Sequence, residues 1–253
     1  MAATGTAAAG GADKQAAFAK GLEGVIGGQT AVCSIEQDKL IYRGYEIHDL
    51  AANATFEEVA FLLLVGHKPS ESELKKFQCE AAGERQLHPA VTSFIEGSAG
   101  WLASGRAVPM DVLRTAVSIL GHTDPDCQDN SAAANMRKSR RLLAKVPTIV
   151  GHMQNAIDGR PMIAPDPALG HAANLLYMMT GRRPSVDEAR VMDVSLILYA
   201  EHEFNASTFT CRVIAGTLSD MYGAVCGGIG ALKGPLHGGA NEMAMEMLKE
   251  IYR

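Results

Sequence analysis

Helix start signals recur along most of the chain, and they restrict the fold more than any other feature of the sequence. Three of them fit the capping box, in which a hydroxyl side chain and a carboxylate three residues later each bind a free backbone amide of the first helical turn. The pairs are Thr55 with Glu58, Ser70 with Glu73, and Ser185 with Glu188. This punctuation predicts a protein built mostly of α-helices.

Strand signals are confined to the first part of the chain. Residues 30–35 and 40–42 are short apolar runs on either side of the polar run 36–39, which is typical of a small β-hairpin. No strand pattern alternates with the helices that follow, so a parallel α/β sheet is not expected. We therefore expect a mostly helical domain with a small N-terminal β-hairpin.

Proline and glycine positions predict further helix bounds. Pro109 is expected to open a helix that Gly121 closes, because proline suits the first helical position and glycine suits the end. Residues 130–158 indicate a long helix that Pro147 should kink or split, since proline lacks an amide hydrogen. The stretch 223–230 is rich in glycine and alanine. We interpret it as a helix whose small side chains let another backbone come close.

Composition assigns the 253-residue chain to soluble globular proteins, with 47% hydrophobic and 20% charged residues. The net charge of -5 argues against nucleic-acid binding, and no apolar run approaches the roughly 18 residues that a membrane span needs. Five cysteines form no C-x-x-C pair, which favours reduced thiols in the cytoplasm. Residues 1–20 are rich in alanine and glycine without a signal core, and we expect a flexible tail there.

Three chemical motifs are incomplete. Residues 122–129 collect one histidine, three aspartates and a cysteine, but they lack the glycine and terminal glutamate of an EF-hand, so a solvated loop is the better interpretation. His202 and Glu203 begin an H-E-x-x-H zinc motif, yet Ala206 replaces the second histidine. Residues 228–234 resemble a dinucleotide loop, but Lys233 occupies its third glycine position. No metal or cofactor is therefore expected.

Two segments remain as candidates for chemistry. His202, Asn205 and Ser207 lie together at an expected break between two helices. His237 lies between Pro235 and two glycines, just before the last expected helix, whose N-terminal dipole disfavours a charged imidazole. A neutral imidazole there can donate a hydrogen bond to a carbonyl that becomes an enolate. The alternative is a satisfied histidine at a tight turn.

The same segments resemble the citrate synthase family. Residues 199–210 and 230–242 carry the resemblance most strongly, and residues 42–47 and 109–114 match in the same order. It extends from about Gly21 to the last residue. Within the family the chain is similar to the bacterial 2-methylcitrate synthase and citrate synthase branch.

The resemblance implies a Claisen-type condensation of an acyl-CoA with oxaloacetate, followed by thioester hydrolysis. It implies that His237 donates to the thioester oxygen and that His202 binds oxaloacetate. It places Ser207 where a hydroxyl orients His237, and Asn205 beside it in the oxaloacetate pocket. The acyl-CoA is propionyl-CoA for a 2-methylcitrate synthase or acetyl-CoA for a citrate synthase.

The resemblance also implies a domain division. Residues 21–233 correspond to the large helical domain, and residues 234–253 begin the segment that leads to the small domain. The family's second active-site histidine, its catalytic aspartate and its substrate-binding arginines correspond to positions beyond residue 253. We therefore expect the 253-residue polypeptide alone to be inactive. A homodimer is implied, with residues 215–231 as the expected contact; the alternative is a helical scaffold or regulatory fragment without the chemistry.

Overall fold

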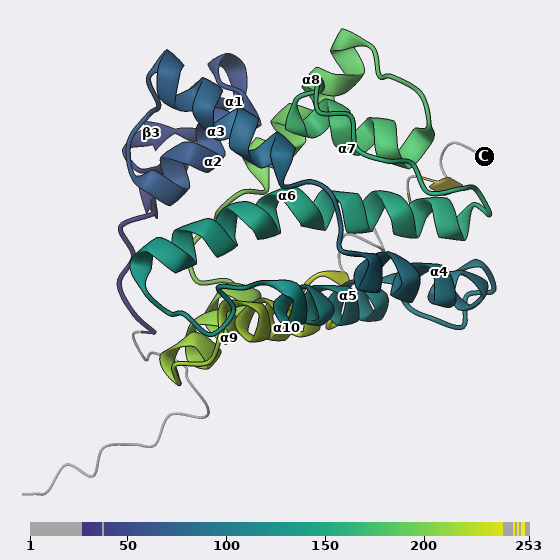
Figure 1. Ribbon diagram of the computed structural model, residues 1–253. Coiled ribbons are helices and arrows are strands. Elements are labelled where there is room, and N and C mark those ends of the chain that lie inside the picture. Colours follow the sequence, from purple (N-terminus) through teal and green to yellow (C-terminus); the bar gives the residue numbers. More distant parts are fainter. Residues whose placement is uncertain (1–26, 37, 240–244, 246, 248, 251–253) are drawn as a thin grey trace, which may run out of the picture.

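The computed structural model describes residues 27–36, 38–239, 245, 247, 249 and 250. The expected tail, residues 1–20, and half of the expected segment 234–253 lie outside these residues. The described part forms three strands and ten helices (Figure 1). They are β1 Cys33–Glu36, β2 Lys39–Tyr42, β3 Tyr45–Glu46, α1 Ile47–Asn53, α2 Phe56–Val65, α3 Glu71–Gly83, α4 Pro89–Ala103, α5 Pro109–Thr123, α6 Ala132–Ile157, α7 His171–Thr180, α8 Val186–Leu198, α9 Ala206–Gly216 and α10 Met221–Leu232.

The predicted fold class, mostly helical with a small N-terminal hairpin, is confirmed. Strands β1 and β2 form the hairpin, with Cys33 opposite Tyr42. A third strand, β3, was not expected; it pairs antiparallel with β2 through Tyr45 opposite Tyr42. The turn that Arg43 and Gly44 make between β2 and β3 has positive φ angles at both residues, which lets the chain reverse within two residues.

All three predicted capping boxes form at the N-termini of α2, α3 and α8. In each, the hydroxyl accepts a hydrogen bond from the backbone amide of the glutamate, and the glutamate side chain accepts one from the amide of the hydroxyl residue. The local signal therefore determined where these three helices begin.

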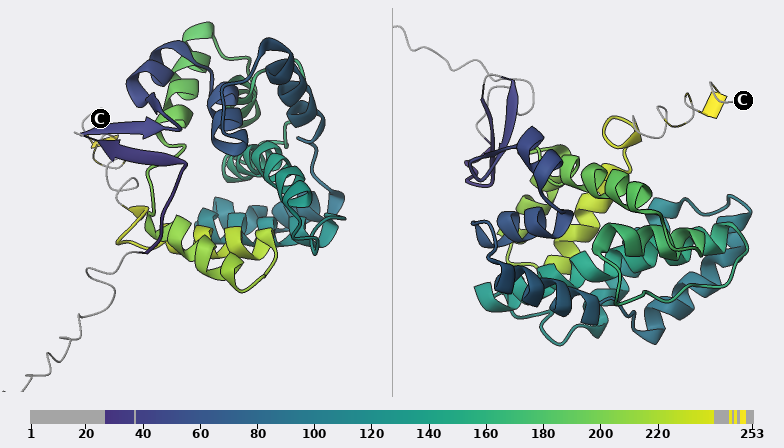
Figure 2. Two further views of the ribbon diagram at one scale, coloured as in Figure 1. Left: turned by 90° about the vertical axis from the view of Figure 1, so that its left-hand side faces the viewer. Right: turned by 90° about the horizontal axis from the view of Figure 1, so that it is seen from above.

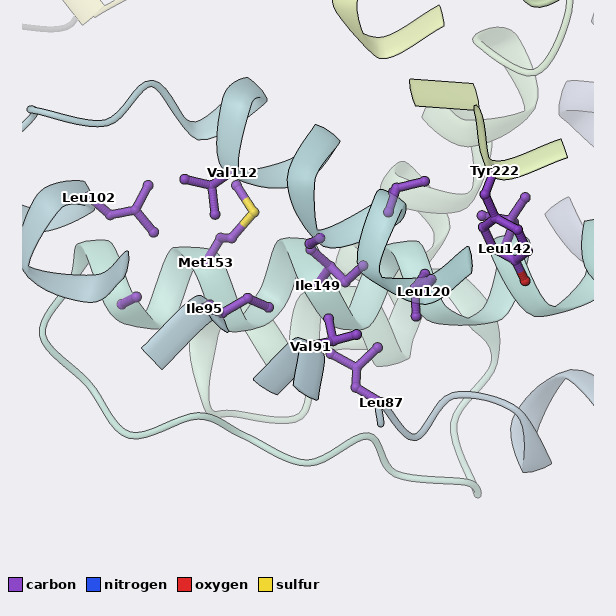
Figure 3. Close-up of a cluster of buried hydrophobic side chains, with 13 residues drawn as sticks. Leu87, Val91, Ile95, Leu102, Val112, Leu120, Leu142, Ile149, Met153 and Tyr222 are labelled. Atoms are coloured by element: carbon purple, nitrogen blue, oxygen red, sulfur yellow. The ribbon is translucent and has the colours of Figure 1, made fainter. Parts of the chain in front are cut away.

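The long helix α6 lies between two groups of helices. Figure 1 shows α1, α2, α3, α7 and α8 on one side of it, and α4, α5, α9 and α10 on the other. Figure 3 shows the larger buried cluster, in which Ile149 and Met153 of α6 pack with side chains of α4 and α5, and Tyr222 joins from α10. A second cluster joins the hairpin to α1, α2 and the end of α8, through Tyr42, Leu50, Leu62 and Ile197 among others.

The expectation that Gly121 closes a helix is wrong, and of the two outcomes expected at Pro147, a kink or a split, the split does not occur. Pro147 does not split the long helix, because α6 continues from Ala132 to Ile157 and its buried neighbours Ala144 and Ile149 hold both halves in the core. Gly121 does not close α5, which ends at Thr123. Instead Gly121 is buried where α5 meets α10, and a methyl group there would lie 3.0 Å from Tyr222 Cβ. Gly121 serves tertiary packing, which local sequence signals do not report.

Among the described residues, none of the helices combines the length and apolar character that a membrane span requires.

Replacing the buried Gly151 by alanine should destabilise the protein. The added methyl would lie 2.7 Å from Met178 Cβ, next to the backbone of α7, so α6 and α7 would have to separate. Overpacking of this kind costs about 1–3 kcal/mol, which outweighs the helix preference of alanine over glycine, about 1 kcal/mol. Urea unfolding should show a net loss of up to about 2 kcal/mol.

The matched control is Gly97→Ala in α4, where nothing lies within 4 Å of the added methyl. This change should leave stability unchanged or raise it by up to about 1 kcal/mol. Equal stability changes in the two variants would show that α6 and α7 do not pack as closely as described.

Candidate functional site

His237, Ser207 and Asn205 form one hydrogen-bonded chain. His237 Nε2 lies 3.2 Å from Ser207 Oγ, and Ser207 Oγ donates to Asn205 Oδ1 at 2.6 Å. His237 itself lies in a turn just after α10, which is closed by hydrogen bonds from its own amide to Gly234 O and from the Gly238 amide to Leu232 O. The structure therefore joins three of the four sequence-predicted site residues across 30 positions of the chain.

Asn205 is fixed because it caps helix α9. Its Oδ1 accepts a hydrogen bond from the Thr208 amide at 2.8 Å, and its backbone has the extended conformation usual for an N-cap (φ -60°, ψ 165°). Ser207 lies in the first turn of the same helix. One capping interaction thus orients both residues that hold His237.

The hydroxyl proton of Ser207 decides which nitrogen of His237 carries a proton. When that proton points to Asn205 Oδ1, Ser207 Oγ can accept only from a protonated Nε2, and a neutral imidazole then leaves Nδ1 as an acceptor. When the hydroxyl turns to His237, it donates to Nε2, and Nδ1 carries the proton instead. The second tautomer is the one that presents a donor away from Ser207.

Close packing of α9 against α10 brings these residues together. A methyl group at Gly227 would overlap the Ile214 side chain, and one at Gly228 would overlap the sulfur of Cys211. The expectation that small residues in 223–230 admit a second backbone is confirmed, and the partner is α9 of the same chain. Gly228 also faces Ser207, since a methyl there would lie 3.4 Å from Ser207 O.

His202 lies apart from this chain of hydrogen bonds. It is exposed on the segment between α8 and α9, three residues before Asn205. Within residues 27–36 and 38–239, no hydrogen bond links it to His237, Ser207 or Asn205. His202 is therefore close to Asn205 along the chain, but no hydrogen bond of the described residues joins the two side chains.

Sequence reasoning missed the residues that hold the His202 segment. Tyr42 Oη donates to Glu201 O at 2.7 Å and accepts from the Glu201 amide at 3.1 Å. Cys33 Sγ donates to Glu201 Oε1 at 3.2 Å. Tyr42 belongs to residues 42–47, which carry part of the family resemblance, so the sequence marked it. Nothing in the sequence distinguishes Cys33 from the other four cysteines.

The acidic residues of segment 122–129 form a cluster of ion pairs. Arg141 contacts both Asp124 and Asp126, at 2.6 and 2.7 Å, and Arg137 contacts Asp126 at 2.6 Å. Hydrogen bonds from Arg137 and Arg141 hold the pKa of Asp126 far below its usual range. Within the described ranges, no group of three or more histidine, cysteine or carboxylate side chains is arranged to hold a metal ion. The segment is thus a largely exposed loop, as expected, and its ion pairs tie it to α6.

Comparison with known proteins identifies the family. Residues 21–253 match the family described as citrate synthase, C-terminal domain. The chain belongs to the citrate synthase family. Its relatives include 2-methylcitrate synthase of Mycobacterium tuberculosis, 44% identical over 94% of this chain and 60% of the relative, and citrate synthase 2 of Bacillus subtilis, 42% identical over 92% of this chain and 61% of the relative. The chain thus spans about 60% of the length of these curated relatives.

Solved structures of citrate synthases share the fold. The enzyme of Pyrobaculum aerophilum superposes with a TM-score of 0.84 at 42% identity, over 91% of this chain and 58% of the other. The enzyme of Thermoplasma acidophilum, solved as a ternary complex with carboxymethyl coenzyme A and oxaloacetate, gives a TM-score of 0.82 at 28% identity, over 92% of this chain and 60% of the other. The sequence resemblance to the family is therefore confirmed.

Removing the cap of α9 should destabilise the protein and free the Ser207 hydroxyl to donate to His237 Nε2. Asn205→Ala loses the acceptor for both the Thr208 amide and the Ser207 hydroxyl, and loss of an N-cap costs about 1 kcal/mol. Asn205→Asp keeps an oxygen at the same place and should restore the stability. Chemical denaturation measures the stability, and the ¹⁵N shifts of the His237 imidazole report its tautomer.

If Asn205→Ala and Asn205→Asp lose equal stability, the capping role assigned to Oδ1 is incorrect.

Proposed function

We propose that this chain forms the large domain of an enzyme that condenses a short acyl-CoA with oxaloacetate and then hydrolyses the thioester. Membership of the citrate synthase family supports this proposal, because the relatives carry the names 2-methylcitrate synthase and citrate synthase. The single observation that carries it is the hydrogen-bonded chain from His237 through Ser207 to Asn205. The Ser207 hydroxyl can turn from Asn205 Oδ1 to His237 Nε2, and in that arrangement Nδ1 carries the proton that this role needs.

The difficult step in such a reaction is removal of a proton beside the thioester carbonyl. In the proposed mechanism His237 donates a hydrogen bond to the carbonyl oxygen, so that negative charge on the enolate is always paired. This role requires the Ser207 hydroxyl to donate to Nε2, which places the imidazole proton on Nδ1. Asn205, which competes for the same hydroxyl proton, thereby influences whether His237 is ready to donate.

We propose that His202 binds a carboxylate of oxaloacetate. Its exposure on the segment between α8 and α9 leaves the imidazole accessible to a substrate. A donor that faces the carboxylate fixes the orientation of oxaloacetate toward the enolate. Asn205 lies at the end of the same segment, and its side-chain amide is proposed to face oxaloacetate as well.

The proposed acyl substrate is propionyl-CoA, with acetyl-CoA as the alternative. The relatives of similar identity include enzymes named for each product. One methylene in an apolar pocket gives about 1–3 kcal/mol of discrimination, so a few side chains decide between the two.

We also propose the domain division that the resemblance implies. Residues 21–233 are the large domain, and residues 234–253 begin the connection to a small domain. The relatives are longer than the matched region, since the chain covers 60% of the Mycobacterium tuberculosis protein. In this proposal the small domain and the segment after it, which correspond to the additional length of the relatives, supply the base, the second histidine and the carboxylate-binding arginines.

Oxaloacetate should bind this chain, and His202→Ala should weaken the binding. A hydrogen bond to a charged group contributes about 1.5–3 kcal/mol, so the dissociation constant should rise roughly tenfold to a hundredfold. Isothermal titration calorimetry measures it. The matched control is His48→Ala, because His48 is exposed on α1 beside Glu46, and this variant should bind like the unmodified chain.

When acetyl-CoA or propionyl-CoA is added to these samples, no coenzyme A thiol should be released, because the base is assigned to the further part. Thiol release at an enzymatic rate would contradict that assignment. Failure of the unmodified chain to bind oxaloacetate would favour the scaffold alternative over the enzyme.

We propose a homodimer formed through the layer of α4, α5, α9 and α10. Helix α9 of the same chain covers Gly227 and Gly228, so these glycines do not provide the contact between two subunits. Large apolar side chains are exposed on this layer instead, with Trp101 of α4 56% and Val213 of α9 55% exposed. Exposed apolar surface of this kind favours association.

Light scattering after size exclusion should therefore give twice the 26.8 kDa chain mass. Val213→Asp should lower the measured mass toward a monomer, because it would place a charge in the contact. A monomeric unmodified chain would contradict the dimer.

A further inference from the structure

The backbone on both sides of His202 is held by buried groups, although His202 itself is exposed. Glu201 precedes it and is bound through its amide, its carbonyl and its carboxylate. Glu203 follows it with a φ of 71°, a left-handed conformation that is uncommon for a residue other than glycine, asparagine or aspartate. Such a conformation persists only where surrounding contacts maintain it.

The contacts that maintain it converge on the amide of Glu203. This amide donates to Cys33 Sγ at 3.0 Å and to Glu201 Oε1 at 2.7 Å. Cys33 Sγ in turn donates to Glu201 Oε1 at 3.2 Å, which closes a small ring of three groups around the turn. The ring therefore restrains the backbone on both sides of His202, and with it the direction of the Cα–Cβ bond from which the imidazole extends.

One member of the ring, Cys33, comes from the hairpin, which lies about 170 residues before Glu201 and Glu203 in the sequence. Cys33 of β1 and Tyr42 of β2 are directly opposite each other in the sheet, and both are buried. Tyr42 holds the backbone of Glu201 and also lies 3.1 Å from Ile197 O, at the end of α8. Figure 2 (left) shows the segment between α8 and α9 passing beside these strands.

The protonation of the two hairpin residues suits this role. Burial, together with the Glu201 carboxylate, raises the pKa of the Cys33 thiol to about 12. Burial likewise raises the pKa of Tyr42 to about 12. Both groups therefore keep their protons at neutral pH and remain donors to Glu201, and the thiol is not a nucleophile.

We propose that Cys33 and Tyr42 are positioning residues that set the direction of the His202 imidazole. The expected effect on oxaloacetate affinity rests on the proposed function. The geometric part concerns His202 alone and holds whether or not oxaloacetate is the ligand. It assigns the small N-terminal sheet a role at the substrate-binding segment.

The test compares Cys33→Ala with Cys33→Ser. Alanine removes both the donor to Glu201 and the acceptor for the Glu203 amide, whereas serine keeps a donor and an acceptor at that position. Two readouts are needed: the imidazole resonances of His202 by NMR without ligand, assigned with His202→Gln, and the oxaloacetate affinity by calorimetry. Cys79→Ala, at an exposed cysteine of α3, is the matched control.

Cys33→Ala should shift the His202 resonances and weaken oxaloacetate binding about tenfold, the effect of one lost hydrogen bond near a charged group. Cys33→Ser should return both readouts toward the unmodified chain, and Cys79→Ala should change neither. Tyr42→Phe, which removes the hold on Glu201 without emptying the core, should act in the same direction as Cys33→Ala.

Unchanged His202 resonances in folded Cys33→Ala and Tyr42→Phe would overturn the inference, since the two residues would then only stabilise the sheet. If the unmodified chain binds no oxaloacetate, the proposed function fails separately. The imidazole resonances then still decide whether the hairpin positions His202.

Discussion

The close contact between α9 and α10 is the constraint on which the candidate site depends. Helix α10 presents two glycines there, and a methyl group at Gly227 or Gly228 would overlap Ile214 or Cys211 of α9. Because the two helices touch in this way, the first turn of α9 reaches the turn that follows α10. His237 and Ser207 can then form a hydrogen bond although 30 residues separate them. A methyl group at Gly228 would also lie 3.4 Å from Ser207 O, beside the residue that contacts His237.

The segment between α8 and α9 has a fixed point at each end, supplied by different parts of the fold. At one end, Tyr42 and Cys33 of the hairpin bind Glu201 and Glu203. At the other, Asn205 caps α9. His202 lies between these points, so its backbone is restrained while its imidazole stays exposed. This combination of a fixed backbone and an accessible side chain is what preorganised substrate binding requires.

The candidate site was predictable where its residues also obey local rules. Asn205 is a favourable N-cap residue at an expected helix break, and His237 lies between Pro235 and glycines, so both could be identified from the chain alone. The link of Ser207 to His237 came from the resemblance to the family and agrees with their hydrogen bond. The role of Cys33 could not be predicted, because a lone cysteine in a short strand does not indicate that it will contact Glu201 and Glu203, about 170 residues later.

The sequence by itself determined the helical class, the hairpin and the starts of α2, α3 and α8, because capping and turn formation involve only neighbouring residues. Tertiary structure decided that α6 continues through Pro147, beside which Ile149 lies in the buried core, and that Gly121 lies inside α5 against Tyr222 of α10. It also decided which distant groups meet at Ser207 and at Glu203. Contacts of that kind depend on how helices lie in space, and the local pattern of one segment does not contain that information.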